Sequence, residues 1–542
     1  MNNQTNLKPS NVYLITAVAS LGGLLFGYDT AVISGAVGGL RSFFVSPLSE
    51  SAQTAASAII EFKGLIAMCA LVIFLLFSSF IFKFFKKATA IIVLLVSVFL
   101  IGILLYNNFL STPNVLTENL ENSILGFMVS SALVGCIIGA ALGDRVSNSI
   151  GRRNGLIVAA LLFIISALGS AYPETLPFPM VGNLTTFIIY RVIGGIGVGL
   201  ASMLAPLYIA EMAPANMRGK LVSCNQLAIV SGMLVVYFVN YFIVKGQEDS
   251  WIDTVGWRFM FLSECIPAVL FFFFLLIVPK TPRFQVLKGN DEAAIAVLTK
   301  YNGSSKATEI LADIKKSFKV KKAPWLSYGW AIIIIGLLLS IFQQFVGINV
   351  VLYYAPEIFK GMGMETDASM MQTIIVGAIN LLFTVVAMFT VDRFGRKILM
   401  IIGSIFMAIS MLGLGTVLYA DNSGIAALLL MLLYIAAFAI SWGPVTWVLL
   451  SEIFPNKIKG VMAVAVAVQW LANLVVSWTF PMMNNNTYLN DMFNHGFAYW
   501  IYGLMAVLSG VFIWKFVPET KGKTLEEMEN IWGQSSETVS ES

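Results

Sequence analysis

Three charged residues, Asp29, Arg191 and Glu264, lie inside long apolar stretches of this 542-residue chain. An unpaired charge in an apolar interior is costly, so the Asp and the Arg are expected to pair. If Asp29 takes up a proton, its charge disappears and Arg191 is freed, which would provide a physical basis for proton coupling. The alternative is a static ion pair that only joins two helices. Glu264 is expected to tune this pair or to be structural.

Amide and aromatic side chains form a second group in the same apolar stretches. Amides both donate and accept hydrogen bonds, as a ligand rich in hydroxyl groups requires, and an aromatic ring can cover an apolar C–H face. A single buried amide has a plainer role as a contact between helices. The group comprises Gln226, Gln343, Gln344, Asn349, Tyr353, Asn380, Trp442, Gln469 and Trp470.

The composition shows which solvent surrounds these stretches. Hydrophobic residues make up 58% of the chain and charged residues only 11%, whereas an average soluble domain carries about 25% charged residues. This excludes a soluble enzyme, a disordered chain and a nucleic-acid-binding module. Four cysteines and one histidine, His495, leave little for metal or thiol chemistry. We therefore expect no metal or cofactor, and His495 is expected to be an ordinary surface residue.

Long apolar runs without ten-residue alternation predict membrane-spanning helices rather than a barrel. The candidate spans are 11–33, 64–82, 88–106, 124–142, 154–172, 185–206, 221–244, 257–278, 328–350, 369–391, 397–419, 425–450, 460–481 and 497–517. Lys and Arg in short loops predict the cytoplasmic side of such a protein. Counting alternate spans places the basic loops, both termini and the polar stretch 280–322 on that one side.

Three motifs occur twice in the same order, the second copy about 240–250 residues after the first. Asp144-Arg145 with Gly151-Arg152-Arg153 recurs as Asp392-Arg393 with Gly395-Arg396-Lys397. Glu211-Met-Ala-Pro recurs as Glu452-Ile-Phe-Pro, and Val-Pro-Lys280-Thr recurs as Val-Pro-Glu519-Thr. Two similar halves around a basic linker indicate an alternating-access transporter with its substrate site between the halves.

Longer motifs give the chain a resemblance to a known family. They include Leu21-Gly-Gly-Leu-Leu-Phe-Gly-Tyr-Asp29, Gln343-Gln344-Phe-Val-Gly-Ile-Asn349, Ser441-Trp-Gly-Pro444 and Pro518-Glu-Thr-Lys-Gly-Lys-Thr-Leu-Glu-Glu527. On these motifs the chain resembles the sugar porters of the major facilitator superfamily, and more narrowly the bacterial D-xylose–proton symporters. The resemblance covers nearly all of the chain outside about 51–122.

This resemblance implies roles for the residues above. It implies that Gln226, Gln343, Gln344, Asn349, Asn380, Trp442 and Gln469 contact the sugar, with Tyr353 and Trp470 as supporting lining. It favours proton coupling through Asp29, because facilitators typically carry Asn there. It also implies a cytoplasmic gate of ion pairs, formed by Asp144, Arg145, Arg152, Arg153, Glu211, Arg218, Asp392, Arg393, Arg396, Glu452 and Lys459.

Two positions depart from the family pattern. Met233 stands where the xylose symporters carry a second Gln on the face of Gln226, which leaves the exact sugar open. Lys459 stands where the family usually has Arg, so a two-pronged contact is reduced to a point charge. We therefore expect a looser gate in the second half.

The runs 64–82 and 88–106 exceed the twelve spans of a sugar porter. They enclose a basic turn at 83–87, so the pair is expected to enter the membrane, turn in the cytoplasm and return. Every later span then keeps its orientation. Neither run has polar residues suited to a sugar or an ion, which predicts a peripheral hairpin facing lipid.

The predicted fold is an all-α integral membrane protein with the major facilitator fold of two six-helix halves and an extra two-helix hairpin, about fourteen spans in all. The expected segments are 1–50 with the first helix, 51–122 as the inserted hairpin, 123–279 as the rest of the first half, 280–325 as the cytoplasmic linker, 326–517 as the second half and 518–542 as the tail.

The predicted function is proton-coupled import of D-xylose, or of a closely similar pentose or hexose, across the cell inner membrane. An uncoupled sugar uniporter of the same fold is the alternative, followed by a membrane sugar sensor. No metal, nucleophile or phosphate motif suggests an enzyme. The expected partners are the sugar, a proton and membrane lipid, with no nucleic acid, and the protein is expected to work as a monomer.

Overall fold

The computed structural model describes residues 9–85, 87–107, 111, 113–175, 182–214, 217–318, 323–421, 424–455, 458, 460–523 and 527–528. Within these ranges all regular secondary structure is helical. Thirteen of the described helical segments are long and apolar enough to cross a membrane. The shorter α3 (Lys87–Leu105) corresponds to the one remaining predicted span, 88–106. The all-α membrane fold is therefore confirmed.

The first half of the chain begins with one long helix, followed by short turns of helix and then the inserted pair. These elements are α1 (Pro9–Leu40), η1 (Arg41–Val45), η2 (Ser46–Ser49), α2 (Ala52–Phe84) and α3. The remaining elements of this half are α4 (Glu118–Ser149), α5 (Arg152–Ala171), α6 (Asn183–Met212), α7 (Arg218–Val244), α8 (Asp249–Trp251), η4 (Ile252–Gly256), α9 (Trp257–Ser263) and α10 (Cys265–Ile277).

Three short helices form the linker, and six spans follow in the second half. The linker contains α11 (Pro282–Leu287), α12 (Asp291–Asn302) and α13 (Ser304–Ser317). The second half contains α14 (Trp330–Phe345), α15 (Ile348–Gly361), α16 (Thr366–Phe394), α17 (Arg396–Tyr419), α18 (Ile425–Ile440), α19 (Trp442–Ile453), α20 (Val461–Asn484), α21 (Thr487–Phe493) and α22 (Phe497–Phe516).

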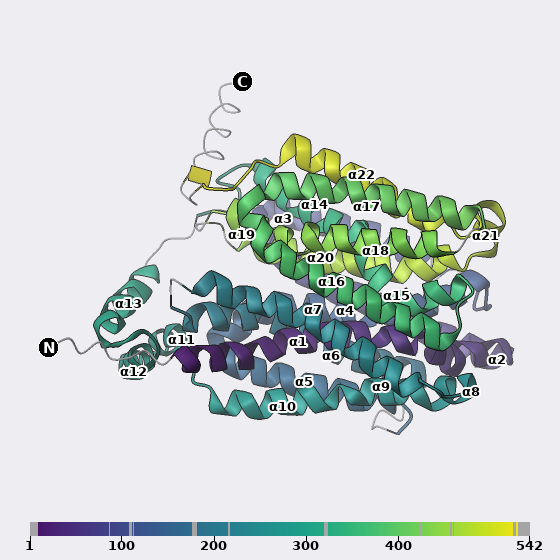
Figure 1. The fold of residues 1–542 in the computed structure, drawn as a ribbon, viewed down its shortest axis with the longest axis horizontal. Coiled ribbons are helices and arrows are strands. Elements are labelled where there is room, and N and C mark those ends of the chain that lie inside the picture. The colour runs from purple at the N-terminus through teal and green to yellow at the C-terminus, as the bar shows by residue number, and fades with distance from the viewer. Residues whose placement is uncertain are drawn as a thin grey trace.

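The two halves lie side by side as two helical bundles, with α11–α13 beyond one end (Figure 1). We call this end the basic face; it carries Arg152, Glu211, Arg396 and Glu452. The other end, where α4 begins and α20 ends, is called the opposite face. The bundle ends thus collect the gate motifs of both sequence repeats at one face.

Close helix contacts in the first half depend on glycine. Four glycines of α6 lie between Gly194 and Gly199, and two of them lie against the backbone of α4. A Cβ added at Gly139 of α4 would lie 2.9 Å from the Cα of Gly199 on α6, and one added at Gly195 would lie 3.0 Å from the Cα of Gly135. Small residues let the two backbones approach in the way that membrane helices commonly do.

Two spans are broken where polar site residues lie. The first break is at Gly347, where α14 and α15 meet and the backbone has φ +90°. A Cβ at this position would also lie 2.7 Å from the ring of Tyr502, so only glycine fits both the conformation and the space. Glu264 lies at the second break, between α9 and α10.

The inserted helices differ from the expected lipid-facing hairpin. Helix α3 fits that expectation, since Leu95, Phe99 and other large apolar side chains on it are exposed at the bundle surface. Helix α2 does not, because Ile59, Phe62, Leu65, Ile66 and Phe80 are buried. It packs against the transporter halves along one side and is exposed along the other.

Among the described residues, the side-chain hydrogen bonds that join the two halves lie toward the opposite face. Asn485 donates to Asn122 at 3.2 Å and Asn486 donates to Asn119 at 2.8 Å. The Thr487 hydroxyl donates to Glu118 at 2.8 Å, and the Trp478 indole N–H donates to the Ser123 carbonyl at 3.0 Å. The part of the chain that the structure describes shows no such bond at the basic face.

Candidate substrate and proton sites

The predicted amides of the second half form one connected network. Gln344 donates to the side-chain oxygen of Gln343 at 3.2 Å, and Asn349 donates to that of Gln344 at 2.6 Å. Gln469, on α20, also donates to Gln343. Gln343 in turn donates to the Trp442 carbonyl at 3.1 Å. The Gln343 side chain, which is 3% exposed, therefore connects α14 to α19 and α20, and α15 joins the network through Gln344.

The aromatic side chains of the predicted set border this network. Trp442 is fully buried and its indole N–H donates to the Ser404 hydroxyl at 2.8 Å. The hydroxyl of Tyr353 accepts a hydrogen bond from Asn473 at 3.4 Å. Trp470 follows Gln469 in sequence, and its buried indole nitrogen has no hydrogen-bond partner among the described residues. The Gln469 side-chain oxygen likewise has none, so a donor and an acceptor remain available beside the network.

Two amides of the predicted set do not join the network through hydrogen bonds. Gln226 is partly buried on α7 of the first half, and Asn380 is buried on α16. Met233, the departure from the family pattern, is buried on α7 two turns after Gln226. The structure thus brings together the members on α14, α15, α19 and α20, while Gln226 comes from the other half.

The sequence-based prediction missed three polar residues of this region. Asn473 and Ser477 extend the row begun by Gln469 along α20, and the Ser477 hydroxyl donates to Asn473 at 2.9 Å. Ser404, on α17, orients the Trp442 indole. The spacing of four residues from Gln469 to Asn473 to Ser477 places all three on one helix face, and this spacing was the signal available in the sequence.

The predicted ion pair is present and deeply buried. The Arg191 Nη1 lies 2.8 Å from Asp29 Oδ1, and the exposed fractions of the two residues are 1% and 0%. Arg191 also donates through Nη2 to the Asp29 backbone carbonyl at 3.2 Å. A Cβ at Gly194 would lie 3.3 Å from Asp29 Oδ1, so glycine at this position gives the carboxylate its space.

Glu264 is a second buried carboxyl beside this pair. It is fully buried and interacts electrostatically with both Asp29 and Arg191. Neither of its oxygens has a hydrogen-bond donor among the described residues, and Asp29 Oδ2 has none either. One guanidinium cannot neutralise two buried carboxylates at once. One negative charge of this group is therefore left without a cationic partner when both acids are ionised.

A single helix links the ion pair to the amide network. Phe26 lies on α1, three residues before Asp29, and its ring centroid is 5.5 Å from that of Trp470 on α20. Residues three apart on a helix lie on neighbouring positions of one face. A movement of α1 at Asp29 would therefore change the contact between Phe26 and Trp470, which is next to Gln469 in sequence.

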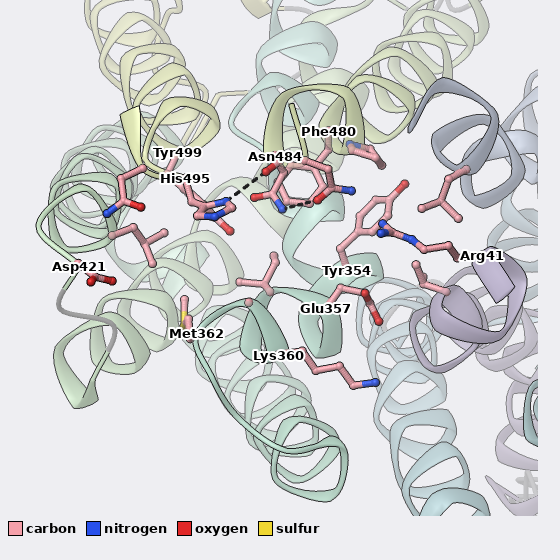
Figure 2. A pocket seen from close by; sticks show the side chains of 18 residues that line it. Arg41, Tyr354, Glu357, Lys360, Met362, Asp421, Phe480, Asn484, His495 and Tyr499 are labelled. Atoms are coloured by element: carbon pink, nitrogen blue, oxygen red, sulfur yellow. Dashed lines mark hydrogen bonds between the residues drawn. The ribbon is translucent and has the colours of Figure 1, made fainter. Parts of the chain in front are cut away.

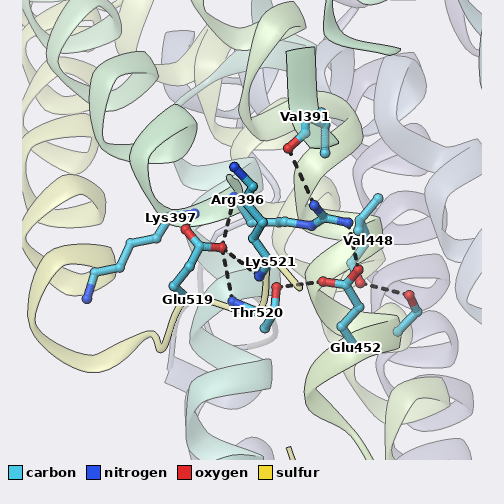
Figure 3. Close-up of polar contacts among 9 residues, drawn as sticks. Val391, Arg396, Lys397, Val448, Glu452, Glu519, Thr520 and Lys521 are labelled. Carbon is cyan, nitrogen blue, oxygen red and sulfur yellow. Dashed lines mark hydrogen bonds and ion pairs between the residues drawn. The ribbon is translucent and has the colours of Figure 1, made fainter. Parts of the chain in front are cut away.

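The gate motif of the second half forms a compact polar cluster at the basic face (Figure 3). Arg396 Nη2 lies 2.9 Å from Glu452 Oε1, and the Thr520 hydroxyl donates to the other Glu452 oxygen at 2.6 Å. Glu519 accepts hydrogen bonds from the backbone N–H groups of Arg396 and Lys397, both at 3.1 Å. It thereby caps the first turn of α17, where an acidic group is favoured.

The first half repeats the ion pair but not the cap. Arg152 Nη2 lies 2.8 Å from Glu211, and Arg153 donates to the carbonyls of Leu275 and Leu276 at 2.8 and 2.9 Å. At the position of Glu519 this half has Lys280. The repeat position that supplies the carboxylate at the start of α17 is therefore a lysine in the first half.

The remaining gate candidates are less closely held. Asp144 is exposed and accepts a hydrogen bond from Asn148 at 3.1 Å. Arg145, Arg218 and Arg393 are exposed, and none of them forms an ion pair within the described residues. Lys459 and the side chain of Asp392 lie outside what the structure describes, so the expected looseness of the second gate stays a prediction.

A cavity of about 250 Å³ opens at the opposite face, apart from the amide network (Figure 2). It lies between α1 and the ends of α15 and α20, and is lined by Arg41, Tyr354, Glu357, Lys360 and His495 among others. The Nδ1 of His495 lies 3.2 Å from the Asn484 carbonyl oxygen. His495 therefore has a partner, which the sequence did not indicate.

Comparisons with known proteins agree with this geometry. The family described as "Sugar (and other) transporter" matches residues 15–532. The D-xylose-proton symporter of Escherichia coli (strain K12) is 51% identical, over 98% of this chain and 97% of that protein. The glucose facilitated diffusion protein of Zymomonas mobilis is 38% identical, over 78% of this chain and 90% of that protein.

A solved structure gives the same result for the fold. The inward open conformation of the xylose transporter XylE from E. coli matches with a TM-score of 0.75 and 50% sequence identity. The match covers 96% of this chain and all of that one.

Proposed function

This chain belongs to the sugar transporter family, and we propose that it carries D-xylose, or a closely similar pentose or hexose, together with a proton by alternating access. The similarity to a named D-xylose-proton symporter extends over nearly the whole of both chains. It supports both the sugar and the proton in this proposal.

The sugar site is the network centred on Gln343. Its amides offer donors and acceptors to a ring of hydroxyl groups, and Trp442, Trp470 and Tyr353 offer apolar surface to the C–H face. The unpaired Gln469 oxygen and Trp470 nitrogen suit a hydroxyl group, which both accepts and donates. Gln226 and Asn380 complete the site when the first half and α16 approach the sugar.

The proton site is Asp29, and a movement of α1 connects this residue to the sugar site. Protonation removes the charge that holds Arg191, which weakens the contact between α1 and α6. The displaced helix moves Phe26 against Trp470, next to Gln469 of the sugar site. This contact between Phe26 and Trp470 is the observation that carries the proposal, because it joins the two sites through one rigid helix. Glu264 holds the proton in exchange with Asp29.

Orientation and assembly follow from the same arrangement. We place the basic face in the cytoplasm of a cell with the protein in its inner membrane, since loops rich in Lys and Arg stay on that side. The pairs Arg152–Glu211 and Arg396–Glu452 then belong to the cytoplasmic gate. We further propose that the protein functions as a monomer surrounded by lipid.

Proton uptake into proteoliposomes tests the proposal directly. Adding xylose to liposomes that contain the purified protein and an internal pH dye should acidify the lumen, whereas an equal addition of glucose should have a smaller effect. Xylose entry without any pH change would instead establish the uncoupled uniporter. Absence of transport with either sugar would reject the proposed substrate class.

A further inference from the structure

The inserted helix α2 is attached to the first half near the opposite face. Ile59 and Phe62 are fully buried, and the Phe62 ring packs edge-on against Phe127 of α4 with centroids 5.7 Å apart. One residue earlier, Glu61 accepts a hydrogen bond from the Thr185 hydroxyl of α6 at 3.1 Å. This end of α2 is therefore fixed to α4 and α6 by burial and by a polar contact.

The other end of α2 is attached to the second half. Phe80 is buried against Val464 and Ala467 of α20. The Phe84 ring lies 5.0 Å from Trp325, just before α14, and 6.2 Å from Trp330 at its start. The ammonium group of Lys83 also lies 5.0 Å from the centre of the Trp325 ring. We call Phe80, Phe84, Trp325 and Trp330 the aromatic contact.

The two attachments are separated by the thickness of a membrane. Phe62 and Phe84 are twenty-two residues apart on one unbroken helix, which corresponds to roughly 33 Å at 1.5 Å per residue, close to the hydrocarbon core of a bilayer. One rigid element thus joins the opposite face of the first half to the basic face of the second. Met68, Leu71 and Leu75 on its other side are exposed.

We propose that α2 is a strap that stabilises the conformation in which the halves are bonded together at the opposite face. In alternating access the halves rotate, so that they separate at the opposite face and approach at the basic face. A rigid helix fixed to both halves at different faces cannot follow both movements. The aromatic contact must therefore slide or break in the other conformation, and its loss should favour that conformation.

The aromatic contact is the end expected to yield. At the Phe62 end, Ile59, Phe62, Leu65 and Ile66 are all buried, and a hydrogen bond adds to the packing. At the aromatic contact only Phe80 of α2 is buried, whereas Phe84 is partly exposed. The strap thus travels with the first half and releases the second half.

Distance measurements between the halves test the strap. Two labelled pairs, introduced after alanine has replaced the four native cysteines, report one face each. Ser149→Cys with Ile398→Cys reports the basic face, and Lys245→Cys with Tyr488→Cys reports the opposite face; all four positions are exposed. Electron–electron double resonance then gives the populations of the two conformations without any sugar.

The test variant is Phe84→Ala, and Phe82→Ala is its matched control, since Phe82 lies on the same turn of α2 but is 49% exposed. Phe84→Ala should shift the population toward separation at the opposite face by about two- to tenfold, the range expected for the loss of an aromatic pair. Phe82→Ala should leave it unchanged. Trp325→Ala should produce the same shift, and the double variant no more than either alone.

Two results would overturn the strap. One is a Phe84→Ala population equal to that of Phe82→Ala. The other is a fall in thermal stability with unchanged populations, because a purely structural contact would behave in this way. If Phe84→Ala does not fold, Trp325→Phe, which shrinks the ring without removing it, decides by the same populations. The strap rests on the proposed alternating access, but this readout involves no sugar or proton and fails separately from the uptake assay.

Discussion

Arg191 contacts Asp29 at two points, the carboxylate at 2.8 Å through Nη1 and the backbone carbonyl at 3.2 Å through Nη2. The second contact does not depend on the charge of Asp29. Protonation should therefore loosen the joint between α1 and α6 without separating the two helices. The contact with the backbone carbonyl thus limits how far α1 can move when Asp29 is protonated. A small movement of α1 can still reach the second half through the contact between Phe26 and Trp470.

Replacing Asp29 by Asn should separate transport from the proton. The amide keeps an acceptor for Arg191 but removes the titratable group, so accumulation of xylose driven by a pH gradient should be lost while exchange of labelled for unlabelled xylose continues. Both rates can be measured in the same proteoliposomes. Asp313→Asn, at an exposed position on α13 of the linker, should retain both. Gradient-driven accumulation by Asp29→Asn would assign the proton to another group, with Glu264 the first to examine.

Gln343→Ala should weaken sugar binding more than any other single amide change. The substitution removes the acceptor for Gln344 and Gln469 and the donor to Trp442, and each buried group left unpaired costs about 1–3 kcal/mol. We expect the Kd for xylose in isothermal titration to rise at least about tenfold. Gln247→Ala in an exposed loop is the control. Undiminished affinity would remove Gln343 from the site.

Met233→Gln should increase the affinity for xylose relative to glucose. The two side chains have similar volume, so the packing of α7 against α1 should tolerate the change. The new amide would face the same side as Gln226 and could supply one more hydrogen bond, worth about 0.5–1.5 kcal/mol. Competition between xylose and glucose in binding assays measures the effect, with Met233→Leu as the control for volume. Equal ratios in all three proteins would show that this position does not select the sugar.

Glu519→Ala should lower the thermal stability of the purified protein. Glu519 accepts hydrogen bonds from the backbone of Arg396 and Lys397 at the start of α17, and the loss of a helix cap costs about 0.5–2 kcal/mol. The unfolding midpoint in detergent measures this directly. The reduction should appear without any sugar present.

The opposite change in the first half should stabilise the protein. Lys280 occupies the repeat position of Glu519, so Lys280→Glu should place a carboxylate near the start of α5 and raise the unfolding midpoint. Lys280→Gln removes the cation alone and separates the two effects. A midpoint for Lys280→Glu at or below that of the natural protein would show that the two halves do not share this cap.

The fold could be predicted from the sequence because a helix that crosses lipid must be apolar over about twenty residues. Long apolar runs indicated the spans, and the few polar residues within them indicated the two candidate sites. Asp29 and Arg191 are far apart in sequence, yet their pairing could be expected because neither tolerates isolation in an apolar interior. Gln343, Gln344 and Asn349 were likewise evident from their type and from the family motif.

Apolar composition did not reveal that one side of α2 is buried against the rest of the protein. Its buried side follows Phe62, Ile66, Phe77, Phe80 and Phe84, at the spacing of a helix face. The exposed side is equally apolar, with Leu71 and Leu75. Hydrophobic periodicity therefore could not distinguish the buried side of α2 from the exposed side. The sequence shows Lys280 at the repeat position of Glu519. That this position caps a helix became clear only from the hydrogen bonds of Glu519 in the structure.

The bonds that join the halves at the opposite face share one chemical property. Each has at least one uncharged partner, as in Asn122 with Asn485 and Glu118 with Thr487. Dissolved salt weakens the attraction between two exposed charges far more than it weakens such bonds. The contact between the halves at the opposite face should therefore be almost equally strong at low and at high salt concentration.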